Sequence, residues 1–222
     1  MGTAIGELLP LAIGIGISPT TITATVLMLL SNAKSRTVGL LLGCLVGVGG
    51  AVALSALLST LLPIQGSGRS SPEAGVIKLV AGALFLILAV SQWRGRPETG
   101  ERAELPKWMT AVDSMTPARA LVLGVVLSAV VPKNLLLALS AGVIVGEAGL
   151  SVGEAAVVIL VFTVIATSTV AVPVVAYLVA PARMSGPLEQ LREWLVDNSV
   201  TIMVVVLLVI GVLMIGNSFA SF

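Results

Sequence analysis

The sequence predicts an all-α integral membrane protein, with six transmembrane helices arranged as two inverted repeats of three helices. Hydrophobic residues make up 57% of the 222 residues and charged residues only 10%, with a mean hydropathy of +1.10. This composition excludes a water-soluble globular protein. Six apolar runs are long enough to cross about 30 Å of hydrocarbon. Two of these runs contain a proline followed by two polar residues in mid-span, and we expect these helices to be broken.

The six apolar runs divide the chain into two halves. They lie at residues 4–30, 38–62, 75–93, 118–146, 153–180 and 199–220. We expect an N-terminal three-helix repeat over 1–93, a cytoplasmic connection over 94–117, and a C-terminal repeat over 118–222. Because three spans is an odd number, the second repeat is upside down relative to the first. A chance pairing of two prolines is the alternative explanation of the matching breaks.

The charge balance excludes several classes of function. Lys and Arg number 12 against 11 Asp and Glu, which is too few to form a basic surface for nucleic acid. The chain has no histidine and one cysteine, Cys44, so zinc sites, dithiol exchange and Ser-His-Asp hydrolysis lack their usual groups. We therefore expect no nucleic-acid partner, no metal, no cofactor and no enzymatic activity.

The basic residues also predict the orientation. They gather after the first, third and fifth runs, so by the positive-inside rule these loops are cytoplasmic. Both termini are then extracytoplasmic in a multi-pass protein of the cell membrane. No Lys or Arg precedes Lys34, so we expect the first run to remain as a span. The three tryptophans all fall at the predicted cytoplasmic interfaces: Trp93, Trp108 and Trp194.

The first break is predicted around Pro19. Ser18 as N-cap with Pro19 at the first helical position is typical of a helix start, and Thr20 and Thr21 add hydroxyls. A helix start inside a membrane presents unpaired N–H groups and a positive dipole end, which suit an anionic group. The alternative is a proline kink whose hydroxyls bond their own helix.

The second break contains the most informative residue, Lys133, between Pro132 and Asn134. An ammonium at mid-helix costs at least ~2.5 kcal/mol in a membrane. No Asp or Glu is expected at its depth, so its partners are backbone carbonyls, water, Asn134 and hydroxyls, or a transient anion. A neutral lysine, or a salt bridge to Glu7, is the alternative.

Three further patterns concern packing. A small-residue face in the second run lets another backbone approach closely; it consists of Gly39, Gly43 and Gly47. Thr163 and Thr167 in the fifth run form interhelical hydrogen bonds or line a pathway. Residues 187–197 form an amphipathic interfacial helix leading into the sixth span, and Cys44 is a small buried hydrophobe.

Together these features resemble the GAP or Sap family of glycolipid- and sulfolipid-addressing proteins, a branch of the LysE exporter superfamily. The resemblance rests on the Gly-Ile-Ser18-Pro19 break, the glycine-rich second helix, a Trp-containing middle loop and Pro132-Lys133-Asn134-Leu135. Where the family has Asn-Pro-Lys-Asn, Val131 replaces the first Asn. The resemblance implies export, flipping or delivery of a cell-envelope lipid by two inverted repeats, paired as a homodimer.

We therefore expect a transporter or flippase that exports an anionic cell-envelope lipid or glycolipid, with its head group near Lys133 and the two breaks. The alternatives are a LysE-type exporter of amino acids or other small solutes, and a non-transporting membrane scaffold for lipid assembly. The candidate substrate-binding residues are Lys133, Asn134, Pro132, Ser18, Pro19, Thr20, Thr21 and Thr167.

Overall fold

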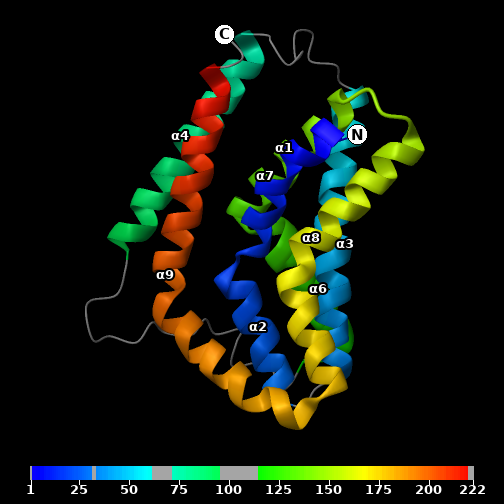
Figure 1. The fold of residues 1–222 in the computed structure, drawn as a ribbon, viewed down its shortest axis with the longest axis vertical. Coiled ribbons are helices and arrows are strands. Elements are labelled where there is room, and N and C mark those ends of the chain that lie inside the picture. Colours follow the sequence, from blue (N-terminus) through cyan, green and yellow to red (C-terminus); the bar gives the residue numbers. More distant parts are fainter. Residues whose placement is uncertain (1, 32–33, 62–71, 96–114, 220–222) are drawn as a thin grey trace.

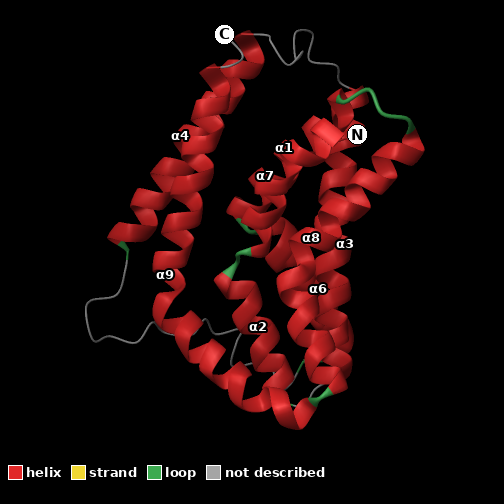
Figure 2. Ribbon diagram, viewed as in Figure 1, coloured by secondary structure: helices red, strands yellow, loops and turns green. Residues whose placement is uncertain are grey.

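The computed structural model describes residues 2–31, 34–61, 72–95 and 115–219. This part of the chain is built from helices and contains no strand, so the all-α class is confirmed for it (Figure 2). Trp108 and most of the connection predicted at 94–117 lie outside the described residues.

The helices follow the predicted apolar runs closely. Two runs are split, the first into α1 and α2 and the fourth into α6, a π-helix η2 and α7. The elements are α1 (Gly2–Gly16), α2 (Pro19–Leu30), α3 (Lys34–Leu61), α4 (Pro72–Arg94), α6 (Pro117–Val125), η2 (Val126–Val130), α7 (Pro132–Glu147), α8 (Val152–Val179) and α9 (Pro181–Phe219).

The described helices indicate a membrane protein. Three of them, α3, α8 and α9, are long and apolar enough to cross a membrane. The pair α1–α2 bends by 55° and the pair from α6 to α7 by 69°, which gives up to five spans if each pair counts as one. The described apolar part of α4, Leu79–Arg94, is shorter than a full span.

Helix α9 differs from the prediction. An interfacial helix over 187–197 and a separate span over 199–220 were expected, but one helix of 39 residues runs through both. The polar residues at the expected junction support the helix instead of ending it: Asn198 donates to the carbonyl of Trp194 at 2.9 Å, and Ser199 to that of Val196 at 3.2 Å. The chain therefore stays helical across the junction, and α9 changes direction along its length instead of breaking (Figure 1).

Successive helices run in opposite directions when each bent pair is taken as one unit (Figure 1). The start of α1 and the end of α9 consequently lie at the same end of the molecule, as the predicted topology requires. Helix α4 packs mainly against α9. The α1–α2 pair lies against α8 from the other half, and α6 and α7 lie against α3.

The glycine face of α3 explains how closely α6 approaches it. A Cβ on Gly39 would lie 2.6 Å from the carbonyl oxygen of Pro117, and one on Gly43 would collide with that of Leu121. The predicted close approach is therefore confirmed, with α6 as the partner. Cys44 is also buried beside this contact, as expected.

Candidate functional site

The first helix break forms where the sequence predicts it. α1 ends at Gly16, α2 begins at Pro19, and Ser18 occupies the N-cap position with φ −120° and ψ 99°. The expected capping bond is not made, because the Ser18 hydroxyl bonds no backbone N–H. It accepts a hydrogen bond from the Thr21 hydroxyl at 3.1 Å instead. The first turn of α2 therefore has no side-chain cap on its N–H groups.

The carbonyls at the end of α1 are bonded by distant residues. A helix leaves its last four carbonyls without helical partners, and inside a membrane each needs a donor. The Lys133 amine donates to the carbonyl oxygens of Gly14 at 2.7 Å and Ile17 at 2.9 Å. The Thr169 hydroxyl donates to that of Gly16 at 2.8 Å. Donors from α7 and α8 thus add to the local bonds at the end of α1, in which the Ile17 N–H donates to Ile13 and the Ser18 N–H to Gly16.

Lys133 is almost fully enclosed, with 3% of its surface exposed. Its ammonium lies at the negative end of the α1 dipole, where a cation is stabilised. Backbone carbonyls, the first of the predicted partners, hold it in place of the carboxylate of Glu7, which lies on an exposed part of α1. An ammonium has three donors and two are used. Within the described part of the chain, Lys133 has no carboxylate partner.

At the second break, the bonding side chain is that of Asn134, the residue after Lys133. η2 ends at Val130, α7 begins at exposed Pro132, and Val131 at the N-cap offers no side-chain cap. The Asn134 amide donates to the carbonyl oxygen of Leu127, in η2, at 2.9 Å. Lys133 therefore donates hydrogen bonds to carbonyls at the first break, and Asn134 donates one to a carbonyl at the second. The Oδ1 atom of Asn134 is buried, and it has no hydrogen-bond partner among the described residues.

The threonines of α8 do not make the interhelical hydrogen bonds that were the first of their two predicted roles. Thr163 and Thr167 donate to carbonyls of their own helix, Ile159 and Thr163, both at 2.7 Å. They make no interhelical hydrogen bond, because each hydroxyl reaches the carbonyl four residues back more easily than a neighbouring helix. Thr169 makes the interhelical bond instead. Of the predicted site residues, Thr20 is half-buried beside the break and Thr167 is buried within α8.

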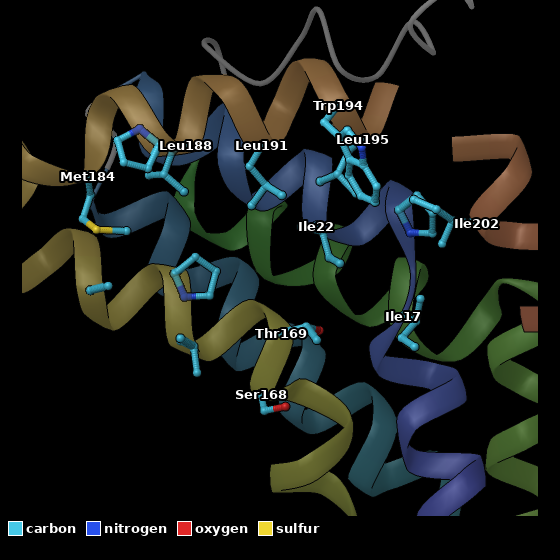
Figure 3. A pocket seen from close by; sticks show the side chains of 15 residues that line it. Ile17, Ile22, Ser168, Thr169, Met184, Leu188, Leu191, Trp194, Leu195 and Ile202 are labelled. Atoms are coloured by element: carbon cyan, nitrogen blue, oxygen red, sulfur yellow. The ribbon is translucent and has the colours of Figure 1, made fainter. Parts of the chain in front are cut away.

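A groove of about 610 Å³ adjoins the first break (Figure 3). Ile17, Pro19 and Ile22 form one wall, the second half of α8 forms another, and the first part of α9 forms the third. Of the predicted site residues, only Pro19 lines it; Lys133 reaches it indirectly, through the carbonyl of Ile17.

The acceptors of these hydrogen bonds could not be identified from the sequence. Gly14, Ile17 and Leu127 take part only through their carbonyl groups, which every residue has, so no residue pattern marks them. The π-helix η2 also gave no signal in the sequence. Thr169, one residue after Ser168 and four before Pro173, carried a weak signal as part of a polar cluster in the fifth run.

Comparison with known proteins agrees with the resemblance inferred from the sequence. A family model described as Sap, sulfolipid-1-addressing protein, matches residues 8–220. Neither the comparison with curated proteins nor that with solved structures gave a match. Because the family model covers nearly the whole chain, this chain belongs to the Sap, sulfolipid-1-addressing protein, family.

Proposed function

We propose that this membrane protein exports or flips an anionic cell-envelope lipid, with the lipid head group bound where Lys133 joins the two helix breaks. The observation that carries the proposal is a buried ammonium held by two backbone carbonyls, without a carboxylate partner among the described residues. A buried charge without a fixed counter-ion favours an anionic ligand.

The groups around the breaks support an anion rather than a cation. The ammonium has a third N–H for a head-group oxygen, and the first turns of α2 and α7 begin without side-chain caps. Such helix starts attract negative charge. Ser18 is 2% exposed, and its oxygen accepts from Thr21, so its own hydrogen is available to a ligand.

The arrangement of the helices supports a transporter built from two inverted three-helix repeats, with α4 as a sixth span. Both bent pairs resume at a proline, Pro19 or Pro132, and corresponding helices of the two halves run in opposite directions. Broken helices in matching positions of inverted repeats are typical of transporter binding sites. We also propose that the protein forms a homodimer, that both its termini are extracytoplasmic and that it belongs to the LysE superfamily. We propose no enzymatic activity.

The family favours lipid cargo over the two alternative functions. A LysE-type amino-acid exporter would use the same ammonium for a carboxylate but has no need of the apolar groove at Ile17. A non-transporting scaffold for lipid assembly would function without the charge of Lys133. The two alternatives therefore make different predictions for a variant that removes only this charge.

The test is native mass spectrometry of the purified protein with its co-purifying lipids. We expect Lys133→Met to lose anionic lipid, and Lys133→Arg to retain part of it. Arg119→Met is the matched control, because it removes one exposed cation from the same bent pair. Equal amounts of anionic lipid on the wild type and on Lys133→Met would reject the head-group site. Retention of amino acids rather than lipids would favour the alternative exporter.

A further inference from the structure

The apolar groove beside the first break has a chemistry distinct from the polar contacts of Lys133. We propose that it binds a hydrocarbon chain of the lipid whose head group lies at the joined breaks, an inference that rests on the proposed function. Its volume of about 610 Å³ falls within the range of small-molecule binding sites. Its walls come from the first break, from α8 and from α9, as shown in Figure 3; the α8 and α9 walls are successive in the chain.

The groove wall offers little to a polar solute. None of the residues that line it is charged. Its two hydroxyl groups already donate to carbonyls, Ser168 to Ile165 at 2.7 Å and Thr169 to Gly16 at 2.8 Å. A polar molecule entering the groove would lose more hydrogen bonds to water than the wall can replace, since only the two hydroxyl oxygens and the Trp194 indole N–H are polar, whereas a hydrocarbon chain loses none. The chemistry of the wall therefore selects an alkyl chain.

The groove adjoins the polar centre through two residues that belong to both. Ile17 lines the groove with its side chain and accepts a hydrogen bond from Lys133 with its carbonyl. Thr169 likewise lines the groove and bonds the end of α1. A lipid whose head group lies at the break consequently has apolar wall directly beside it for its chain.

The first part of α9 is suited to close the groove at a membrane surface. Leu188 and Leu195 are 2% and 3% exposed, so this segment is packed firmly onto the protein. Trp194 also lines the groove but is 55% exposed, which places it at the rim. Glu193 and Asp197 of the same segment are exposed. A tryptophan between apolar and charged surfaces is typical of the membrane–water interface, where a lipid chain enters.

The test uses photolabelling of the full-length protein in lipid nanodiscs. Two probes carry the same diazirine-bearing acyl chain: a phosphatidic acid, which is anionic, and a diacylglycerol, which is neutral. The variant Val172→Trp places an indole at the groove wall, and Ala176→Phe fills the same wall one turn further on. Val164→Trp is the matched control, since Val164 is exposed on the same helix but does not line the groove.

We expect both probes to label the α8 and α9 walls of the wild type. Val172→Trp and Ala176→Phe should each lower this labelling about tenfold, equivalent to a loss of about 1.4 kcal/mol in binding, and Val164→Trp should not. Wild-type labelling of the walls by both groove variants, or labelling spread evenly over the exposed helices, would overturn the inference. A loss confined to diacylglycerol would also overturn it, because the chain would then belong to a neutral bilayer lipid.

A third variant separates this inference from the proposed function. Lys133→Met should lower labelling by phosphatidic acid but leave labelling by diacylglycerol intact. If phosphatidic acid labels Lys133→Met as it labels the wild type, while the groove variants lose labelling, the head-group site is rejected and the chain site stands.

Discussion

The Lys133 amine donates a hydrogen bond of 2.7 Å to the carbonyl oxygen of Gly14, which lies 119 positions earlier in the chain. This bond joins α7, which begins at the second break, to α1, which ends at the first break. Asn134, the next residue, bonds Leu127 within its own half. Two adjacent side chains thus each hold one break: Lys133 bonds the end of α1, and Asn134 bonds η2.

Replacing Lys133 with Met should loosen the first break without unfolding the protein. Hydrogen bonds from a charged donor contribute about 1.5 to 3 kcal/mol each to stability. Removing the buried cation also removes its desolvation penalty, which offsets part of that loss. We expect hydrogen exchange at the amides of residues 17–18 and 20–22 to accelerate at least about tenfold, because the Ile17 carbonyl loses its donor. Mass spectrometry of deuterium uptake measures this change.

Lys133→Arg keeps a donor at this position and should show a smaller increase in exchange at residues 17–22. Arg119→Met, at an exposed position, should show no increase there. If Lys133→Met exchanges like the wild type across these residues, the hydrogen bonds to Gly14 and Ile17 do not hold the break.

Thr169→Val should destabilise the protein more than Thr167→Val. Thr169 supplies a second donor to the Gly16 carbonyl across the α1–α8 contact, besides the backbone N–H of Ser18, whereas Thr167 bonds its own helix. Losing this interhelical hydrogen bond costs about 0.5 to 1.5 kcal/mol, while a hydroxyl that bonds its own helix contributes little. The free energy of unfolding, measured by SDS titration in mixed micelles, compares the two variants, and equal losses would contradict the assignment.

The positions of the breaks could be predicted from the sequence, because each combines a proline with two following polar residues in mid-span; proline alone is not sufficient, since Pro10, Pro173 and Pro187 lie inside α1, α8 and α9. Pro19 and Pro132 each begin a helix, as expected. The apolar runs likewise predicted the helices, since length and composition decide membrane insertion. The continuous α9 was not predicted, because Asn198 and Ser199 suit both a helix end and a helix interior.

Ser18→Ala should weaken lipid binding, while its effect on stability should be limited to the one hydrogen bond that Thr21 donates to Ser18, about 0.5 to 1.5 kcal/mol. Ser18 occupies an N-cap position but bonds no backbone N–H, so no capping bond is lost. Ser151 is the comparison, since it caps α8 through a capping box with Glu154. Ser151→Ala should lower the free energy of unfolding by about 1 kcal/mol. The hypothesis for Ser18 fails if Ser18→Ala binds anionic lipid like the wild type in native mass spectrometry.

The partners of the site residues could not be predicted, because they depend on contacts between distant segments. The sequence indicated that Lys133 needs a partner, and the structure identifies it as the end of α1. It also predicted interhelical bonding or pathway lining for Thr167. The first was wrong, because a hydroxyl on a helix has a local acceptor, and only the position of the neighbouring backbone decides between the two acceptors. Thr169 lies opposite the break and so bonds across to Gly16.

Gly43→Ala should destabilise the protein strongly, whereas Gly50→Ala should not. A Cβ on Gly43 would collide with the carbonyl oxygen of Leu121 and lie 3.0 Å from the Cα of Gly124, so α3 and α6 would have to separate. Overpacking of this kind costs about 1 to 3 kcal/mol. Gly50, on the same helix, has no atom within 4 Å of its added Cβ and should gain about 0.5 to 1 kcal/mol from the better helix former. SDS titration of both variants measures the difference; equal free energies of unfolding would show that the α3–α6 contact does not require glycine.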